Sequence, residues 1–402
     1  MAEGSAVSGA ADAAGSTARS ERDLRIDFFR GLALIFIFID HVPGNILSVV
    51  TIGSFGFSDA AEVFIFLSGY SAAFVYGRVQ RARGFIVALA QIWKRCWQLY
   101  VAHIFLFVVF TAEVAYIAAR FRNPMFAEEM NVANFLQEPH IAVMMALSLQ
   151  FQPAFMDILP LYIALLLLFP FALWGIERSP ALVLAISVAA YVVQWWFNFD
   201  MPAYPEGSNW FFNPFAWQLL FVIGAVIGHA TVAGRRLVLR GWPIIAAAGA
   251  IVAGSLIIVM SWKLANISPR VPALLLDELW PVDKTDLALV RLVHFLAVAY
   301  LVAVLVPPEH RMLRAPAAYP VILCGQNSLH IFCLSIFLCV IGHLAVVQLD
   351  YAFWVQALVN GFGIGIMMLT AGIILVQVDR ANGKGPDRRV NCAAFGRELS
   401  AA

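Results

Sequence analysis

The chain has 402 residues, of which 62% are hydrophobic and only 13% are charged. A soluble domain carries about 25% charged residues, so this composition excludes an ordinary soluble protein. The net charge of +1 comes without a concentrated basic patch, which argues against a nucleic-acid partner. The composition predicts a polytopic helical membrane protein.

The ends of the chain differ from its middle. Residues 1–21 are rich in Ala, Gly and Ser and lack the apolar core of a secretory signal, which predicts a disordered cytoplasmic tail. Apolar segments fill residues 22–378, where no repeat or linker suggests a division, so we expect a single transmembrane domain. Residues 379–402 form a second, basic cytoplasmic tail in this interpretation.

About ten apolar segments are each long enough to cross a hydrocarbon core of about 30 Å. They lie near residues 26–48, 58–78, 98–120, 158–176, 181–198, 212–232, 243–262, 287–306, 318–346 and 351–377. Residues 84–97 are expected to form an amphipathic interfacial helix that leads into the third span, and residues 139–151 a short surface or re-entrant helix. The predicted fold is therefore an all-α transmembrane bundle.

The basic residues predict the orientation of this bundle. Arginine clusters follow the even-numbered spans, as at residues 78–83 and 235–240, whereas the connections 49–57 and 199–211 contain no Lys or Arg. By the positive-inside rule, both termini are cytoplasmic. The five cysteines show no disulfide framework and no Cys-x-x-Cys spacing, so no metal site is predicted.

The first apolar segment contains Arg30 and His41, eleven residues apart. Eleven helical steps return to nearly the same face and rise about 16 Å. A charged side chain inside a membrane costs about 2.5–3.5 kcal/mol on insertion scales, which favours a function for such a residue. Asp27 precedes Arg30 by three residues, so the two side chains can pair; a plain interfacial ion pair is the alternative.

His41 stands where the first helix is expected to break. Asp40 precedes it and Pro43-Gly44-Asn45 follows, and a broken helix suits a cavity better than a lipid face. The alternative is a neutral imidazole that bonds across the bundle and only stabilises packing.

The second apolar segment begins with Asp59 and Glu62, one turn apart and near the depth of His41. A contact between either carboxylate and the imidazole would fix the tautomer of His41. The alternative is structural: Asp59 as the N-cap and Glu62 as its partner in a capping box. The cap is favoured for Asp59 and function for Glu62.

An ordered set of motifs gives the chain a resemblance to a known family. The set is Arg30-(x)10-His41, Val63-Phe-Ile-Phe-Leu-Ser-Gly69, Phe151-Gln-Pro-Ala-Phe-Met-Asp157, Asn213-Pro-Phe-Ala-Trp217-Gln218, Asp283-Lys284-Thr285 with Arg291 and His294, and Gly325-Gln-Asn327-Ser-Leu-His330. It resembles the OpgC family, which succinylates osmoregulated periplasmic glucans and belongs to the multi-pass membrane acyltransferases. The resemblance extends over residues 22–378; the late motif differs from that of the wider superfamily, which leaves the role of His330 open.

This resemblance implies an O-succinyltransferase of the bacterial inner membrane. Its donor would be a cytosolic acyl-CoA, such as succinyl-CoA, acting as a co-substrate with no bound cofactor, and its acceptor a hydroxyl of a periplasmic glucan. Arg30 and Asp27 would bind the donor, and His41 would act as the general base, a contribution of about 10²–10⁴ in rate. Direct transfer is preferred, with an acyl-histidine intermediate as the alternative.

The remaining candidates would form the acceptor or acyl site. Asp157 is a second catalytic candidate between two prolines, with a helix cap as the alternative. Lys284, Arg291 and His294 could hold the succinyl carboxylate or the glucan; the alternative, which is favoured for Lys284, is that Lys284 and Arg291 extend to the interface. The other candidates are Asp40, Asp59, Trp217, Gln218 and Asn327, for which interfacial aromatic belts or amides that bridge helices are the alternatives.

Two other functions fit the same architecture. An enzyme that transfers acetyl groups to another surface glycan would differ only in the acyl pocket. A glycan transporter would also have charges within the membrane and broken helices, but such proteins usually show two related halves, which this sequence lacks. The sequence does not indicate the oligomeric state.

Overall fold

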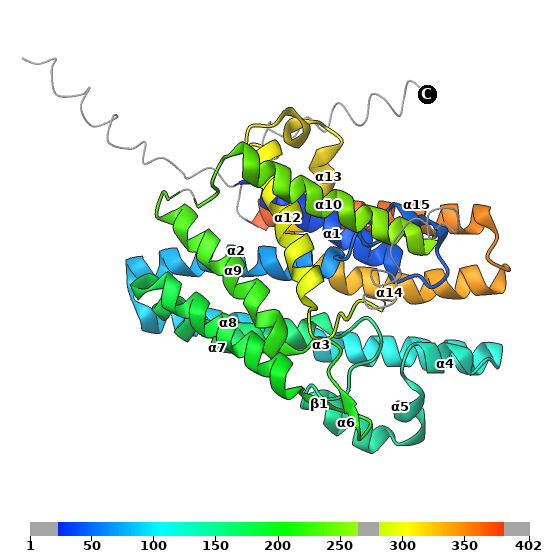
Figure 1. Cartoon of the computed structure of the whole chain (residues 1–402). Helices are drawn as coiled ribbons and strands as arrows, with labels where there is room; N and C mark the ends of the chain where they lie inside the picture. Colours follow the sequence, from blue (N-terminus) through cyan, green and yellow to red (C-terminus); the bar gives the residue numbers. More distant parts are fainter. Residues whose placement is uncertain (1–22, 236, 264–280, 382–402) are drawn as a thin grey trace, which may run out of the picture.

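The computed structural model describes residues 23–235, 237–263 and 281–381 (Figure 1). The predicted tail at residues 1–21 lies outside these residues, as does the tail at 379–402 beyond its first three positions. Within the described ranges the chain is helical, apart from the two-residue strands β1 (Pro202–Ala203) and β2 (Ser208–Asn209), which pair antiparallel. The all-α prediction is confirmed.

The helices fall into long and short classes. The long ones are α1 (Leu24–Asp40), α2 (Ala60–Arg83), α3 (Phe85–Phe121), α7 (Ile158–Arg178), α8 (Pro180–Phe197), α9 (Pro214–Val232), α10 (Trp242–Lys263), α12 (Leu289–Leu305), α14 (Ser328–Gln348) and α15 (Phe353–Ala381). The short ones are η1 (Ile46–Val50), η2 (Ile52–Ser54), α4 (Met125–Glu129), α5 (Ala133–Gln137), α6 (Pro139–Leu147), η4 (Arg311–Arg314) and α13 (Ala318–Gln326).

Eight of the described helices are long and apolar enough to cross a membrane: α2, α3, α7, α8, α9, α10, α14 and α15. The predicted count of ten is therefore not reached. The first and eighth predicted spans are α1 and α12, each of 17 residues, and the ninth is shortened because Asn327 separates α13 from α14. The chain is a multi-pass membrane protein, and its orientation remains a prediction.

The helix predicted at residues 84–97 leads into the third span without a break. From Phe85 on it is the first part of α3, which continues for 37 residues because no Gly or Pro interrupts the sequence from 85 to 121. Gly84 makes the turn from α2 into α3 with a φ of 86°, a conformation that other residues rarely adopt. Residues 139–151 contain α6, whose nine residues are too few to cross a membrane.

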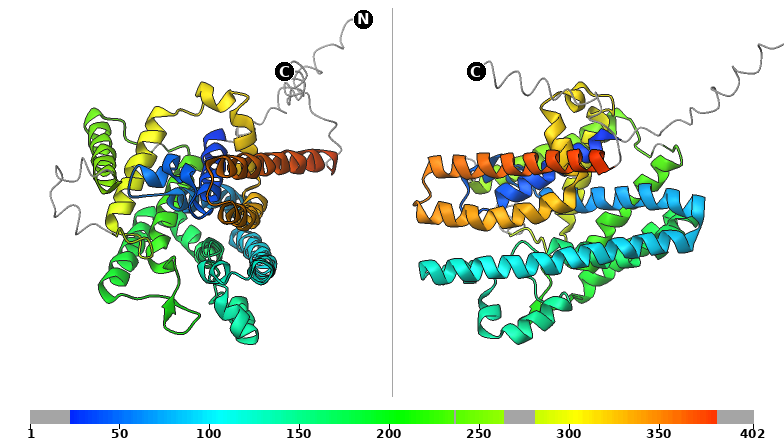
Figure 2. Two further views of the ribbon diagram at one scale, coloured as in Figure 1. Left: turned by 90° about the vertical axis from the view of Figure 1, so that its right-hand side faces the viewer. Right: turned by 180° about the vertical axis from the view of Figure 1, so that it is seen from behind.

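Helix α1 lies in the centre of the bundle, as the end-on view in Figure 2 shows. It packs against α2, α13, α14 and α15, while α3, α7, α8 and α9 form the adjoining part of the bundle. The short helices α4–α6 and the β1–β2 hairpin gather beyond α3 and α7 (Figure 1). Their connections reach back toward the end of α1, where the site described below lies.

Helices α2 and α9 pack with their backbones in close approach. A Cβ atom built on Gly69 would lie 2.0 Å from the carbonyl oxygen of Phe221, and one on Gly224 would lie 2.2 Å from that of Phe66. No side chain fits in such a space. Small residues at helix contacts allow this approach in membrane proteins, where van der Waals packing drives helix association.

We expect Gly224→Ala to destabilise the protein, because the new methyl group must push α9 away from α2. Overpacking of this kind costs about 1–3 kcal/mol, which should lower the thermal unfolding midpoint in detergent by several degrees. Gly254→Ala in α10 is the matched control, because nothing lies within 4 Å of the atom it adds. Equal midpoints for the two variants would contradict the proposed packing constraint.

Candidate functional site

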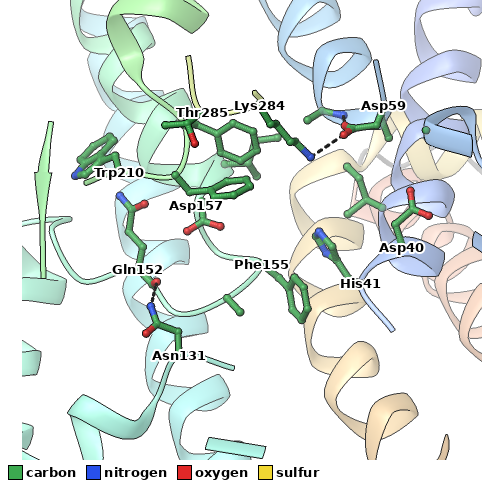
Figure 3. A pocket seen from close by; sticks show the side chains of 18 of the residues that line it. Asp40, His41, Asp59, Asn131, Gln152, Phe155, Asp157, Trp210, Lys284 and Thr285 are labelled. Carbon is green, nitrogen blue, oxygen red and sulfur yellow. Dashed lines mark hydrogen bonds and ion pairs between the residues drawn. The ribbon is translucent and has the colours of Figure 1, made fainter. Parts of the chain in front are cut away.

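A cavity of about 910 Å³ lies where the end of α1 meets the beginnings of α2 and α7. Its walls also include the η1–η2 segment, the connection before α7, the β1–β2 hairpin and residues 284–285. Figure 3 shows the cavity from close by. The polar side chains on its walls include Asp40, His41, Asp59, Asn131, Gln152, Asp157, Lys284 and Thr285.

Five of the sequence-predicted residues share this cavity. They are Asp40, His41, Asp59, Asp157 and Lys284, which come from four separate parts of the chain. The other eight do not line it: Asp27, Arg30, Glu62, Trp217, Gln218, Arg291, His294 and Asn327.

His41 is the C-cap of α1, and its backbone N–H donates to the carbonyl oxygen of Ile37 (3.0 Å). Helix α1 ends here because Pro43 and Gly44 follow, the latter with a φ of 71°. Nδ1 of the imidazole is buried and has no hydrogen-bond partner among the described residues. The partial negative charge of a helix C-terminus favours a proton on this ring, while burial favours the neutral form.

Phe155 stacks on the imidazole of His41, with 4.3 Å between ring centroids and 24° between the ring planes. Its backbone has a φ of 69°, which is unusual for a bulky residue and typical of strain stored at functional sites. The prediction from sequence missed Phe155. Only its place between Pro153 and Asp157 hinted at irregular backbone, and nothing in the sequence paired it with His41 (Figure 3).

The segment after α1 folds back beside the cavity. Thr51 donates its hydroxyl to Oδ1 of Asp40 (2.9 Å). Asn45 donates its amide to the carbonyl oxygen of Ile39 (3.0 Å) and to Oδ1 of Asn360 in α15 (2.9 Å). The end of α1 is therefore bonded on two sides, which fixes the position of His41.

Asp59 and Glu62 form the capping box that the sequence offered as the structural alternative. Oδ1 of Asp59 accepts from the N–H of Ala61 (2.8 Å), and Oε2 of Glu62 accepts from the N–H of Asp59 (2.9 Å). These bonds begin α2 at the wall of the cavity.

The same two carboxylates bind two cations. Nε of Arg291 donates to Oε1 of Glu62 (2.7 Å), and its Nη2 donates to Oδ2 of Asp59 (3.0 Å). Nζ of Lys284 lies 2.7 Å from that same Oδ2. Glu62 is fully buried and the side chain of Arg291 is 8% exposed, so this pair joins α2 to α12 behind the cavity wall.

The pKa values of the two carboxyls before α2 and α7 shift in opposite directions. Burial by itself would raise the pKa of Asp59, but Lys284 and Arg291 outweigh it and hold this pKa below its ordinary value. Burial raises the pKa of Asp157 to about 7, and the cation Lys284 only partly opposes this. Asp157 therefore titrates close to neutral pH.

His294 contacts the segment before α2, and Trp217 supports the loop that carries Lys284. Nδ1 of His294 lies 2.8 Å from the hydroxyl of Ser58, just before α2. The indole N–H of Trp217, which is fully buried, donates to the carbonyl oxygens of Lys284 and Thr285 (3.1 Å each). Trp217 thus holds backbone, whereas His294 holds a side chain, and neither residue lines the cavity.

Arg30 and Asp27 lie elsewhere on α1. Nη2 of Arg30 donates to the carbonyl oxygen of Leu67 (3.0 Å) and to the hydroxyl of Ser71, both in α2. Asp27 is 2% exposed and accepts from the amide of Gln326 (3.3 Å).

The two amide candidates also serve the helix framework. The amide of Gln218 bonds to the hydroxyl and the carbonyl oxygen of Ser187, which joins α9 to α8. Asn327 donates to the carbonyl oxygen of Leu323 at the break between α13 and α14. Among the residues that the structure describes, no group of three or more His, Cys, Asp or Glu side chains is arranged to hold a metal ion.

We expect Arg291→Leu to destabilise the protein strongly, because it leaves the carboxylate of Glu62 buried without its cation. Breaking a buried pair from one side costs about 3–5 kcal/mol. The double variant Arg291→Leu, Glu62→Leu should recover much of this loss in thermal unfolding in detergent, since no unpaired charge remains at that position. Additive losses in the double-mutant cycle would show that the two side chains do not interact.

Comparison with known proteins identifies the family of this chain. The family described as OpgC protein matches residues 22–377. No curated protein and no solved structure matches this chain. Since the family match covers nearly all of the membrane domain, the chain belongs to the OpgC family and is a membrane glucan succinyltransferase.

Proposed function

We propose that the succinyl group passes from cytosolic succinyl-CoA to a hydroxyl of a periplasmic glucan in the cavity described above, with His41 as the general base. The observation that supports this most directly is the position of the His41 imidazole, at a helix end on the wall of a cavity of about 910 Å³. The connections 49–57 and 199–211 contribute to the same walls. Because they lack Lys and Arg, the cavity lies on the predicted outer side of the bacterial inner membrane.

Three helix ends provide suitable electrostatics for acyl transfer. The C-terminus of α1 lies beside the base, where its partial negative charge stabilises the imidazolium that forms in the transition state. The N-termini of α2 and α7 reach the cavity at residues 59–61 and 157–158. Their partial positive charges stabilise the oxyanion that develops on the thioester carbonyl.

The proposed reaction is a direct transfer. Nε2 of His41 takes the proton from the glucan hydroxyl as its oxygen attacks the thioester carbonyl. The tetrahedral oxyanion then collapses, the C–S bond breaks, and the departing thiolate of CoA takes the proton back from the imidazolium. This assignment of nitrogens follows from the burial of Nδ1.

The uncharged wall of the cavity suits the acceptor. Asn131, Gln152 and Trp210 lie on the side away from Asp40 and Asp59 (Figure 3). Amide groups both donate and accept hydrogen bonds, which matches the hydroxyls of a glucan, and an aromatic ring offers a surface for a sugar face. We place the glucan on this wall and the acyl group on the charged one.

Arg30 and Asp27 remain the proposed donor residues. About 16 Å of helix rise separates Arg30 from His41, so the two lie at different depths of the same helix. The planar guanidinium of Arg30 now bonds to α2 through Leu67 and Ser71, and a phosphate or amide of the donor would offer it equivalent acceptors.

We expect His41→Gln to lower kcat for glucan succinylation by about 10²–10⁴, the usual contribution of a general base, with little change in the KM for succinyl-CoA. The rate is measured with purified protein, succinyl-CoA and isolated glucan, and the succinylated product is quantified by mass spectrometry. His140→Gln, an exposed residue of α6, is the matched control. A kcat within threefold of the unmodified protein would remove His41 from the chemistry.

We also expect an acidic limb in the rate profile that depends on Asp157. Its raised pKa of about 7 means that the carboxyl is mostly ionised at pH 8 and mostly protonated at pH 6. If the carboxylate stabilises the imidazolium of His41, the rate should fall about tenfold between pH 8 and pH 6.

Asp157→Asn should lower the rate at pH 8 and flatten the profile over this range. The assay uses detergent-solubilised protein, so that both sides of the bundle experience the same pH, and subtracts uncatalysed hydrolysis of the donor. An unchanged limb in Asp157→Asn would assign the titration to another group.

A further inference from the structure

We propose that Lys284 recognises the free carboxylate of the succinyl group and thereby selects a dicarboxylic acyl chain. This inference rests on the proposed succinyl-CoA donor in the cavity. Among the described residues, Lys284 is the single Lys or Arg on the cavity wall. Its side chain is 30% exposed, whereas that of Arg291 is 8% exposed.

The present partner of Lys284 can be given up without leaving a charge unpaired. Oδ2 of Asp59 receives both Lys284 (2.7 Å) and Arg291 (3.0 Å), and its Oδ1 receives the N–H of Ala61 (2.8 Å). If the ammonium turns toward a ligand, Asp59 keeps two donors. The reverse does not hold for Arg291, because its departure would leave the fully buried Glu62 without a cation.

The backbone of the loop that carries Lys284 is anchored, whereas the side chain can rotate about the bonds of its stem. Trp217 holds the backbone carbonyl of Lys284, and the N–H of Thr285 donates to Oδ1 of Asp283 (2.9 Å). Beyond that anchor, the lysine side chain has a flexible stem of four carbons and ends in an ammonium with three N–H donors, which can point toward an anion. The backbone of Lys284 is therefore fixed in position, and its ammonium can be redirected toward an anion.

The surroundings of the ammonium suit a short acyl chain that ends in a charge. Nζ of Lys284 lies 5.5 Å from the ring centroid of Phe212 and 5.8 Å from that of Phe211, and both rings line the cavity. These rings can cover the methylene groups of a succinyl chain while the carboxylate meets the ammonium. The additional negative charge would lie near the N-terminus of α2, whose partial positive charge favours it.

The other cationic candidates are poorly placed for this role. Arg291 has its Nε and Nη2 bound to Glu62 and Asp59 behind the wall. His294 faces Ser58, with its ring against Gly56. Thus the structure favours Lys284 alone among the three residues for which sequence patterns suggested carboxylate binding.

A comparison of two donors of equal chain length tests the proposal. Succinyl-CoA and butyryl-CoA both carry four-carbon acyl groups, but only the first ends in a carboxylate. We measure the rate of acyl transfer to purified glucan for the unmodified protein, Lys284→Met and Lys284→Arg. Where butyryl transfer is slow, we measure how well butyryl-CoA competes with succinyl-CoA. Lys263→Met is the matched control, since that lysine ends α10 and does not line the cavity; its Nζ donates to the backbone carbonyl of Ser54 on the wall (3.4 Å), which the substitution does not change.

We expect Lys284→Met to lower kcat/KM for succinyl-CoA by about 30- to 100-fold, the range for loss of a charge-assisted hydrogen bond, and to change binding of butyryl-CoA by less than threefold. Lys284→Arg should keep part of the preference, and Lys263→Met all of it. Equal losses for both donors would assign Lys284 a purely structural role. Unchanged rates for both donors would show that Lys284 takes no part in acyl recognition. Either result overturns the proposal. Failure of the unmodified protein to use succinyl-CoA would instead refute the proposed donor.

Discussion

The buried ion pair between Arg291 and Glu62 is the interaction on which the site depends. In a low-dielectric interior neither charge is tolerated alone, so the pair forces α12 and α2 together although 229 residues separate its members in sequence. The same arginine binds Asp59, the N-cap of α2. One guanidinium thus holds the beginning of α2 at the cavity wall, and Asp59 would keep this cation if Lys284 turned from it toward the proposed ligand.

Close helix packing supplies the second constraint. Besides the contact between α2 and α9, Gly31 of α1 meets the backbone of α13: a Cβ atom there would lie 1.9 Å from the carbonyl oxygen of Val321. Helices in such contact cannot slide without a clash, so the helix ends stay in register with one another. The meeting of the α1 C-terminus with the α2 and α7 N-termini then follows from packing within the bundle, and it gives the cavity its opposed partial charges.

These constraints divide the cavity by chemistry. His41 lies at the helix end that favours a proton, the amides of Asn131 and Gln152 line the wall proposed for the sugar, and Lys284 lies where the proposed acyl group must end. A glucan succinyltransferase has to bring together an alcohol and a succinyl group that ends in a carboxylate, and the proposed arrangement gives each of them a chemically matched surface. The backbone of Phe155, with its positive φ, places an aromatic ring against the base, and this stacking orients the imidazole.

The sequence by itself determined the membrane class, the helical fold and the break after His41, because each of these depends on hydropathy or on residues within four positions of one another. It offered the capping box of Asp59 and Glu62 only as an alternative. It predicted ten spans, of which eight are long and apolar enough among the described helices; α1 and α12 have 17 residues each, and their ends depend on segments that a hydropathy window does not resolve. Only the tertiary structure decided that Lys284 reaches the cavity while Arg291 lies behind its wall, and that Phe155 covers His41. Those outcomes depend on side-chain direction and long-range pairing, which residue type and spacing along the chain do not encode.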